Sequence, residues 1–316
     1  MRITRFITAL SLSLSLLTSL AWAGEFGDHC TTGLASGQMI KTNCAINAQY
    51  LGKTYCFGSD ESKSGFMMHP AESIAKAAAF YAKSAEPERV KISQADALQQ
   101  IASKTCDLSN RDAGYLEFDG MDLRHCNMVN TSFFGAYLRG ANLSGANMQR
   151  SYLNLARLEK TDLSGADLTD AVIFQAIFDK TNFKGANLTG ARVIGTLGNV
   201  DMSAANISHG RFGLDVGNQP MGQMKFDSVG GNFSGANFEG ADLNIAGFRF
   251  ANLTGANLRN TNLYRADLAQ ADLTGADLSG ANLDSADVDG AIFNQVKGLS
   301  MVKGMSSTKG KCTGCK

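Results

Sequence analysis

The sequence feature that constrains the fold most is a period of five residues between Cys106 and Phe293. A large apolar residue, which we call the centre, returns at nearly every fifth position, as in Ala276-Asp277-Leu278-Ser279-Gly280. The residue two positions before the centre is nearly always Ala, Thr, Ser or Gly, and the residue directly before it is usually Asp or Asn. A period of five matches neither a helix, at about 3.6, nor a simple strand, at about 2.

A square coil buries one large and one small residue from every five. Each pentapeptide forms one side, four sides form one turn of twenty residues, and we call that turn a rung. Gly, Asn and Asp tolerate the corners, because Gly accepts positive φ and the other two bond their own backbone. Rungs stacked about 4.8 Å apart pair through their backbones as neighbouring strands do. The period therefore predicts a mainly β solenoid.

Runs such as Ala166-Asp167-Leu168, Ala186-Asn187-Leu188 and Ala276-Asp277-Leu278 resemble the pentapeptide-repeat proteins. The resemblance implies a right-handed quadrilateral parallel β-helix over residues 106–293. A fold of this kind is a scaffold, so it does not by itself imply a function.

The period is disturbed over residues 194–232. Val193 and Phe233 are 40 residues apart, which equals two rungs, and intermediate centres can be assigned throughout. We therefore expect the coil to run through this part with local bulges and without a large insertion. The intermediate centres are Leu197, Met202, Ile207, Phe212, Val216, Met221 and Phe226.

Residues 24–105 lack the period and are predicted to form a separate small α+β domain. The stretch from Gly52 to Pro70, with Lys53, Tyr55 and Phe57, resembles a YHS-type domain, a metal-associated module in which a hairpin strand leads into a short helix. Ser62 stands where that family often carries a second cysteine. Helical spacing predicts a helix over residues 71–83. A serine cap at Ser93 predicts another helix to about residue 104, which we expect to cover the first rung.

Cysteine and histidine residues of this domain allow two interpretations. Cys44, Cys56 and His69, with His29 and Cys30 as further candidates, have the soft ligand set that suits copper or zinc. In an oxidising compartment, two of the three cysteines instead form a disulfide and one is left over, and we favour this interpretation.

Two more cysteine pairs are disulfide candidates. Cys106 and Cys126 are twenty residues apart at small inward positions, so they stack on consecutive rungs, where they either form a bridge or remain free thiols. Cys312 and Cys315 form a Cys-x-x-Cys near the end of the chain, either bridged locally or left as surface thiols. Residues 294–316 are predicted to form a cap followed by a flexible tail.

Residues 1–23 have the pattern of a cleavable signal peptide. Arg2 and Arg5 precede a short apolar run, and the segment closes on Ala21-Trp22-Ala23. We expect the mature chain to begin at Gly24, to have no membrane span, and to be periplasmic or secreted in a bacterium.

The remaining chemistry predicts a non-enzymatic protein. The sequence contains no phosphate-binding loop, zinc-protease motif or nucleophile elbow, and 29 basic residues balance 29 acidic ones, which does not favour a nucleic acid as partner. We expect a scaffold that binds an unknown periplasmic protein, and a homodimer is left open. No cofactor is expected other than the copper or zinc considered above.

The resemblance also implies one alternative function. Some pentapeptide-repeat proteins shield a topoisomerase by presenting an acidic rod that resembles DNA. Between Gly231 and Phe293 there are eight acidic residues and three arginines. The earlier rungs are balanced in charge and export would separate the protein from that target, so this function is the less favoured one.

Overall fold

The computed structural model describes residues 24–26, 29–84, 88–214 and 224–315. The predicted signal peptide, residues 1–23, lies outside the described residues. The chain divides into two compact units, Met1–Glu86 and Pro87–Lys316, which are treated separately below.

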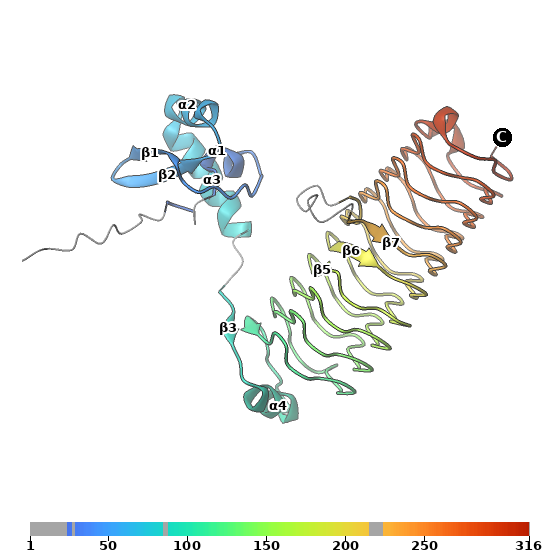
Figure 1. The fold of residues 1–316 in the computed structure, drawn as a ribbon, viewed down its shortest axis with the longest axis horizontal. Coiled ribbons are helices and arrows are strands. Elements are labelled where there is room, and N and C mark those ends of the chain that lie inside the picture. Colours follow the sequence, from blue (N-terminus) through green and yellow to red (C-terminus); the bar gives the residue numbers. More distant parts are fainter. Residues whose placement is uncertain (1–23, 27–28, 85–87, 215–223, 316) are drawn as a thin grey trace, which may run out of the picture. The chain divides into compact units, whose positions relative to one another are not determined.

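The described residues of the amino-terminal unit form a β-hairpin and three helices (Figure 1). Helix α1 (Thr31–Ala35) precedes strands β1 (Ile46–Tyr50) and β2 (Lys53–Phe57), which pair antiparallel. Leu51 and Gly52 join the strands with φ of 49° and 76°, and positive φ at both residues is the property of a two-residue type I′ loop.

Helices α2 (Asp60–Met68) and α3 (Pro70–Ser84) follow the hairpin, and α3 matches the helix predicted over residues 71–83. The Ser59 hydroxyl caps α2 by accepting a hydrogen bond from the Ser62 N–H at 3.2 Å. The ring of Phe66 is fully buried, and its centroid lies 5.3 Å from that of Tyr55 and 5.1 Å from that of Phe57. These rings form a small core between the hairpin and α2.

The division between the units falls earlier than predicted. Strand β3 (Val90–Lys91) pairs with β4 (Arg111–Asp112) of the first rung, and Ile92 and Ala97 are buried in the solenoid core. Residues 88–105 therefore belong to the solenoid, and the domain predicted over residues 24–105 ends near Glu86.

The second unit is the predicted square coil. Successive rungs pair in parallel every twenty residues, as Asp122 pairs with Asn142 and Asn142 with Asp162. The centre Leu123 donates its N–H to the Asn142 carbonyl at 2.8 Å, and Asn142 donates to the Met121 carbonyl at 2.8 Å. In the described rungs, the centres and most of the small residues are buried.

A turn follows most centres, whereas extended backbone continues past Ile173 and Val193. The Leu163 carbonyl accepts the N–H of Ala166 at 3.1 Å, and the intervening Gly165 has φ of 64°, as a type II turn requires at its third residue. Four such turns close one rung. We number the sides by the centres of the first rung: side 1 carries Leu108, side 2 Ala113, side 3 Phe118 and side 4 Leu123.

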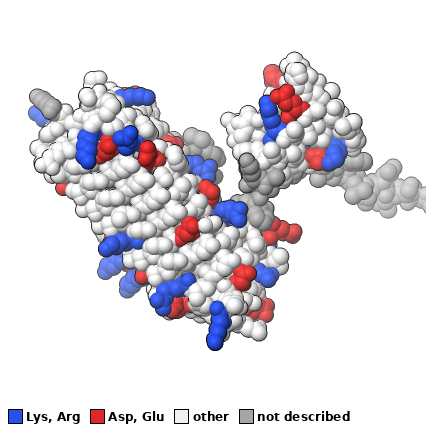
Figure 2. All heavy atoms as spheres, turned by 180° about the vertical axis from the view of Figure 1, so that it is seen from behind, with Lys and Arg blue, Asp and Glu red and all other residues white. Residues whose placement is uncertain are grey.

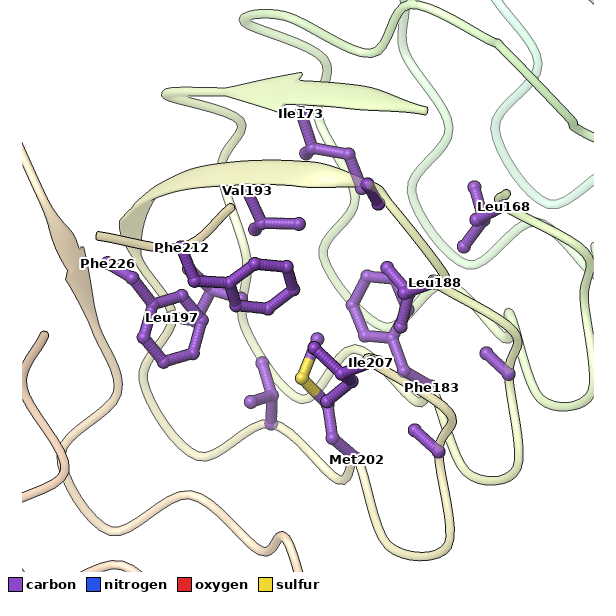
Figure 3. Close-up of a cluster of buried hydrophobic side chains, with 14 of the residues drawn as sticks. Leu168, Ile173, Phe183, Leu188, Val193, Leu197, Met202, Ile207, Phe212 and Phe226 are labelled. Atoms are coloured by element: carbon purple, nitrogen blue, oxygen red, sulfur yellow. The ribbon is translucent and has the colours of Figure 1, made fainter. Parts of the chain in front are cut away.

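Between residues 194 and 232 the coil has a large insertion, so the prediction of local bulges alone is wrong. Asn187 and Asn206 stack 19 residues apart, but Asn206 and Asn237 stack 31 residues apart. Phe212 and Phe226 lie at the two ends of the inserted segment, their ring centroids 5.1 Å apart, and both are buried in the core (Figure 3). Val216 and Met221, assigned as centres from the sequence, lie outside the described residues.

The coil also extends further than predicted. Lys297, Lys303, Lys309 and Thr313 pair with Asp277, Asn282, Asp287 and Ile292, and so complete one more rung. Two 3₁₀ turns, η2 (Leu299–Met301) and η3 (Met305–Ser307), lengthen its corners, which is why the period of five is lost. The described residues after Phe293 thus form a last rung in place of the predicted cap and flexible tail.

Helix α4 (Gln94–Ala102) covers the first rung, as predicted. The Ser93 hydroxyl accepts the Asp96 N–H at 3.1 Å, Ala97 is buried in the solenoid core and Ile101 packs against it, whereas Leu98 is exposed. Among the helices of the described residues, none is long and apolar enough to cross a membrane.

Candidate functional site

Six of the seven cysteines form disulfides. The bridges join Cys44 to Cys56, Cys106 to Cys126, and Cys312 to Cys315, with Cα separations of 4.7, 4.5 and 5.8 Å. Cys30 is buried and remains a thiol. The preference for one disulfide among the three amino-terminal cysteines is confirmed, and of the two options left open for each of the other pairs, the structure has the bridge.

The predicted metal ligands Cys44, Cys56 and His69 are not brought together as a site. The disulfide occupies both thiols, and a bridged sulfur is not the thiolate that a metal requires. His69 ends α2 and lines a shallow surface hollow with Glu72 and Lys76. His29 bonds the Phe26 carbonyl through Nδ1 at 2.8 Å.

Cys30 lies beside this disulfide, since its backbone pairs with that of Cys56. Burial raises the pKa of the Cys30 thiol, but hydrogen bonds with the Thr32 side chain and with the backbone at Gly33 and Gly58 outweigh burial. The pKa of the thiol is therefore lowered from its ordinary value.

The Asp and Asn residues before the centres have a structural role on sides 1 and 4. The Asp162 carboxylate accepts the Ser164 N–H at 3.0 Å, which stabilises the turn, and accepts the Asn182 amide of the next rung at 2.9 Å. The same contacts recur along these sides. The repeated carboxylates are therefore part of the turn, and none of these contacts pairs an acid with a base for catalysis.

Side 2 departs from this pattern in its first five rungs. The stacked residues before its centres are Asp112, Ser132, Tyr152, Val172 and Arg192. Phe134 and Phe174 follow centres where sides 1 and 4 carry mostly polar residues. Strands β5 (Val172–Phe174) and β6 (Arg192–Thr196), which pair in parallel, lie on this side, and β7 (Phe226–Asp227) pairs with the end of β6.

We call Tyr115, Phe134, Tyr152, Leu155, Val172 and Phe174 the side-2 patch. Tyr115 is 67% exposed and Leu155 47% exposed, and the other four are partly exposed. The Tyr115 ring lies over Gly135, where a Cβ would come within 2.7 Å of it, so any larger residue there would displace the ring. Its centroid is 5.5 Å from that of Phe134.

Two arginines stack on this patch. The guanidinium carbon of Arg89 lies 5.6 Å from the Tyr152 ring centroid, and that of Arg192 lies 5.7 Å from the Phe174 centroid. Arg89 also donates hydrogen bonds to the Asn130 carbonyl and side-chain oxygens, each at 3.0 Å. A groove of about 450 Å³ opens beside Arg89, with Lys91, Asp112, Tyr115, Phe134 and Tyr152 in its lining.

A comparison of successive pentapeptides does not reveal this patch. The signal is present at a period of twenty: reading only every fourth residue that precedes a centre gives Ser132, Tyr152, Val172 and Arg192 in one column. The side-3 column, with Glu117, Tyr137, Arg157 and Ile177, also departs from Asp and Asn, whereas the columns of sides 1 and 4 keep them.

The acidic rungs of the carboxyl-terminal half are partly neutralised. Asp267 pairs with Arg249 at 3.0 Å and Asp277 with Arg259 at 3.4 Å. The last rung places Lys297 next to Asp277 and Lys309 next to Asp287. On the face seen in Figure 2, charged side chains are few and both signs occur. This distribution does not favour DNA mimicry.

The family model for pentapeptide repeats matches eight copies, over residues 106–140, 131–170, 166–197, 230–260 and 261–297. Solved structures with a similar chain path include HetL, a pentapeptide repeat protein involved in heterocyst differentiation regulation in the cyanobacterium Nostoc sp. strain PCC 7120. HetL is 22% identical, with 71% of this chain and 95% of HetL covered and a TM-score of 0.32.

Two further structures are similar over part of the chain. One is trypsin-treated QnrB1, a plasmid-mediated fluoroquinolone resistance protein, at 15% identity, with 60% of this chain and 78% of that one covered and a TM-score of 0.33. The other is a pentapeptide repeat protein of the Arabidopsis thaliana thylakoid lumen, at 28% identity, with coverage of 36% and 61% and a TM-score of 0.22.

No curated protein matches this sequence. The matched repeats span about half of the chain, and they coincide with the rungs on both sides of the insertion. This chain belongs to the pentapeptide-repeat family.

Proposed function

We propose that this protein is an exported, non-enzymatic scaffold that binds a partner protein through the side-2 patch. One observation carries the proposal: apolar and aromatic side chains occupy outward positions of side 2 at which sides 1 and 4 carry polar residues that stabilise turns. The fold needs no aromatic residue at these positions, so a binding role accounts for them better than stability does.

The composition of the patch favours a protein partner. Tyrosine, phenylalanine and arginine are enriched in the centres of protein interfaces, and lysine and acidic residues are depleted there. The side-2 patch has this composition, since Arg89 stacks on Tyr152 and Arg192 stacks on Phe174. The matching surface would be apolar and would carry carboxylates opposite the two arginines.

Two features support export. Residues 1–23 have the pattern of a signal peptide, and three disulfides suit an oxidising compartment such as the periplasm.

Site-specific crosslinking tests the proposal. A photoreactive phenylalanine analogue at Phe134 or Phe174 should crosslink one identifiable periplasmic protein. The matched control is the same analogue at Tyr264, which follows a side-2 centre of a later rung and is 39% exposed.

A double variant gives a second test. Phe134→Ser combined with Phe174→Thr places polar residues at these two positions and should weaken binding of that partner at least about tenfold without lowering Tm. Equal crosslinking at Tyr264 or undiminished binding would refute the proposal.

We further propose that the amino-terminal unit is a YHS-like module in which the Cys44–Cys56 disulfide is structural. The hairpin followed by α2 supports the resemblance, and the disulfide favours recruitment over copper or zinc binding. Mass spectrometry of periplasmic protein with and without reductant should show a deficit of about two protons per bridge. Stoichiometric copper or zinc that is lost in Cys56→Ser would make metal handling the leading function instead.

A further inference from the structure

We propose that Cys106, Cys126 and His125 bind one thiophilic d¹⁰ metal ion, Cu(I) or Zn(II), when the Cys106–Cys126 disulfide is reduced. Among the described residues, these three form the one cluster of metal-ligand type, with both sulfurs and a ring nitrogen of His125 within 4.8 Å of one another. The site lies in the first two rungs of the solenoid, and it differs from the amino-terminal ligands considered above.

The coil itself sets the spacing of the two sulfurs. Cys106 and Cys126 occupy the same inward position on consecutive rungs, with Cα atoms 4.5 Å apart. Two thiolates that bind one tetrahedral ion at about 2.3 Å each lie about 3.8 Å apart. This distance is close to the rung spacing, so the reduced pair can hold an ion without moving the backbone far.

His125 supplies the third ligand in a suitable tautomer. Its Nε2 lies 3.0 Å from the Ile101 carbonyl oxygen, which can only accept a hydrogen bond, so Nε2 carries the proton. The lone pair is then on Nδ1. Histidines that bind metals usually donate their other N–H to a carbonyl or carboxylate in this way.

Burial and access fit a small ion. Both cysteines are 3% exposed, whereas His125 is exposed, so an ion can enter from the histidine side and a water molecule can complete the coordination of Zn(II). Two thiolates with an imidazole are ligands that both ions accept.

The disulfide and the ion exclude each other. A dithiol reductant donates two electrons and two protons to the bridge and becomes a disulfide itself. The ion then displaces the two thiol protons from Cys106 and Cys126. The redox state of the bridge therefore decides whether the site exists.

The test uses the full mature chain, reduced with an immobilised phosphine that is then removed. Cu(I) is titrated against bicinchoninate and Zn(II) against 4-(2-pyridylazo)resorcinol, and these two assays distinguish the ions. His125→Asn leaves every cysteine in place and should weaken binding of one equivalent at least about tenfold. The matched control is His209→Asn, an exposed turn histidine in a later rung.

The double variant with Cys106→Ser and Cys126→Ser should bind one equivalent of metal ion fewer than the unmodified reduced chain. Because the loss of the bridge can lower stability, circular dichroism must show that this variant retains its β-solenoid spectrum. The proposal is overturned if His125→Asn binds as tightly as His209→Asn, or if the reduced chain binds no more ion than the double serine variant.

Discussion

At the scale of single residues, each position of the coil has one of two environments. Centres such as Leu273 are fully buried between the rungs above and below, whereas the next residue, Thr274, lies outside the core. A single step along the chain thus changes what a substitution does.

Leu273→Asp is expected to lower the free energy of unfolding by several kcal/mol, because it buries a carboxylate with no partner. Thr274→Asp should change it by less than about 0.5 kcal/mol. Denaturant unfolding followed by circular dichroism compares the two. Similar stabilities for both variants would contradict the inward position of Leu273.

Asp167 links the turn of side 1 to two neighbouring rungs. Its carboxylate accepts hydrogen bonds from the Thr169 hydroxyl at 2.6 Å, the Gln149 amide at 2.6 Å and the Asn187 amide at 3.2 Å. Burial raises the pKa of this carboxyl, but the hydrogen bonds outweigh it and the pKa is lowered from its ordinary value. The ionised form therefore stabilises the fold.

Because the pKa of Asp167 is lower in the folded state, its contribution is present above the unfolded value of about 3.9 and is lost as the pH falls through the folded value. Asp167→Asn should lower Tm by about 2–4 °C at pH 7, since the amide replaces one acceptor oxygen by a donor. The difference from the unmodified chain should shrink below pH 3. Asp272→Asn is the control, because the Asp272 carboxylate accepts the turn hydrogen bond from the Thr274 N–H, as Asp167 does from Thr169. A difference that grows in acid would contradict this assignment.

At the scale of elements, the two ends of the coil are closed in different ways. At the amino-terminal end, the Gln94 side chain acts in place of a strand: its Nε2 donates to the Glu117 carbonyl at 2.9 Å and its Oε1 accepts the Glu117 N–H at 2.8 Å. One amide thus pairs with both backbone groups that the first rung offers at that point.

Gln94→Ala is expected to lower the free energy of unfolding by about 1–2 kcal/mol, because it removes two hydrogen bonds to the backbone. The exchange of the Glu117 amide hydrogen should become faster. Gln99→Ala, on the exposed surface of the same helix, should change neither quantity. Slow exchange at Glu117 in Gln94→Ala would show that another group pairs with this edge.

These elements also show what the sequence can predict. The period of five predicts the coil, because the centres are buried wherever the period holds and a turn follows most of them. It does not predict the insertion, since Val216 and Met221 continue an approximate spacing of five by coincidence. The last rung escapes prediction because its 3₁₀ turns change the spacing at the corners. The metal-type cluster needs the position of His125 relative to two rungs, which no linear spacing shows.

At the scale of the solenoid as a whole, the edges of its terminal rungs decide how copies can associate. The amino-terminal edge is covered by β3 and α4. The carboxyl-terminal edge has no such helix within the described residues, and its outward positions carry Lys297, Lys303 and Lys309, all exposed. Lysine on an open strand edge discourages pairing with a second edge.

A triple variant is expected to associate in a concentration-dependent way when it combines Lys297→Asn, Lys303→Asn and Lys309→Asn. The preceding rung carries Asp277, Asn282 and Asp287 at the paired positions, none of them basic. Neutral asparagine therefore makes the edge resemble an interior rung, which can pair with a copy of itself. Because the amino-terminal edge is covered, pairing joins two carboxyl-terminal ends and stops at a dimer. Sedimentation velocity over a hundredfold concentration range measures this association.

The control is a second triple variant, Lys160→Asn with Lys180→Asn and Lys184→Asn. It removes the same charge from exposed positions in earlier rungs and should not cause association. Dimers in both triple variants would attribute the effect to net charge, and higher oligomers in the first would show that the amino-terminal edge is open.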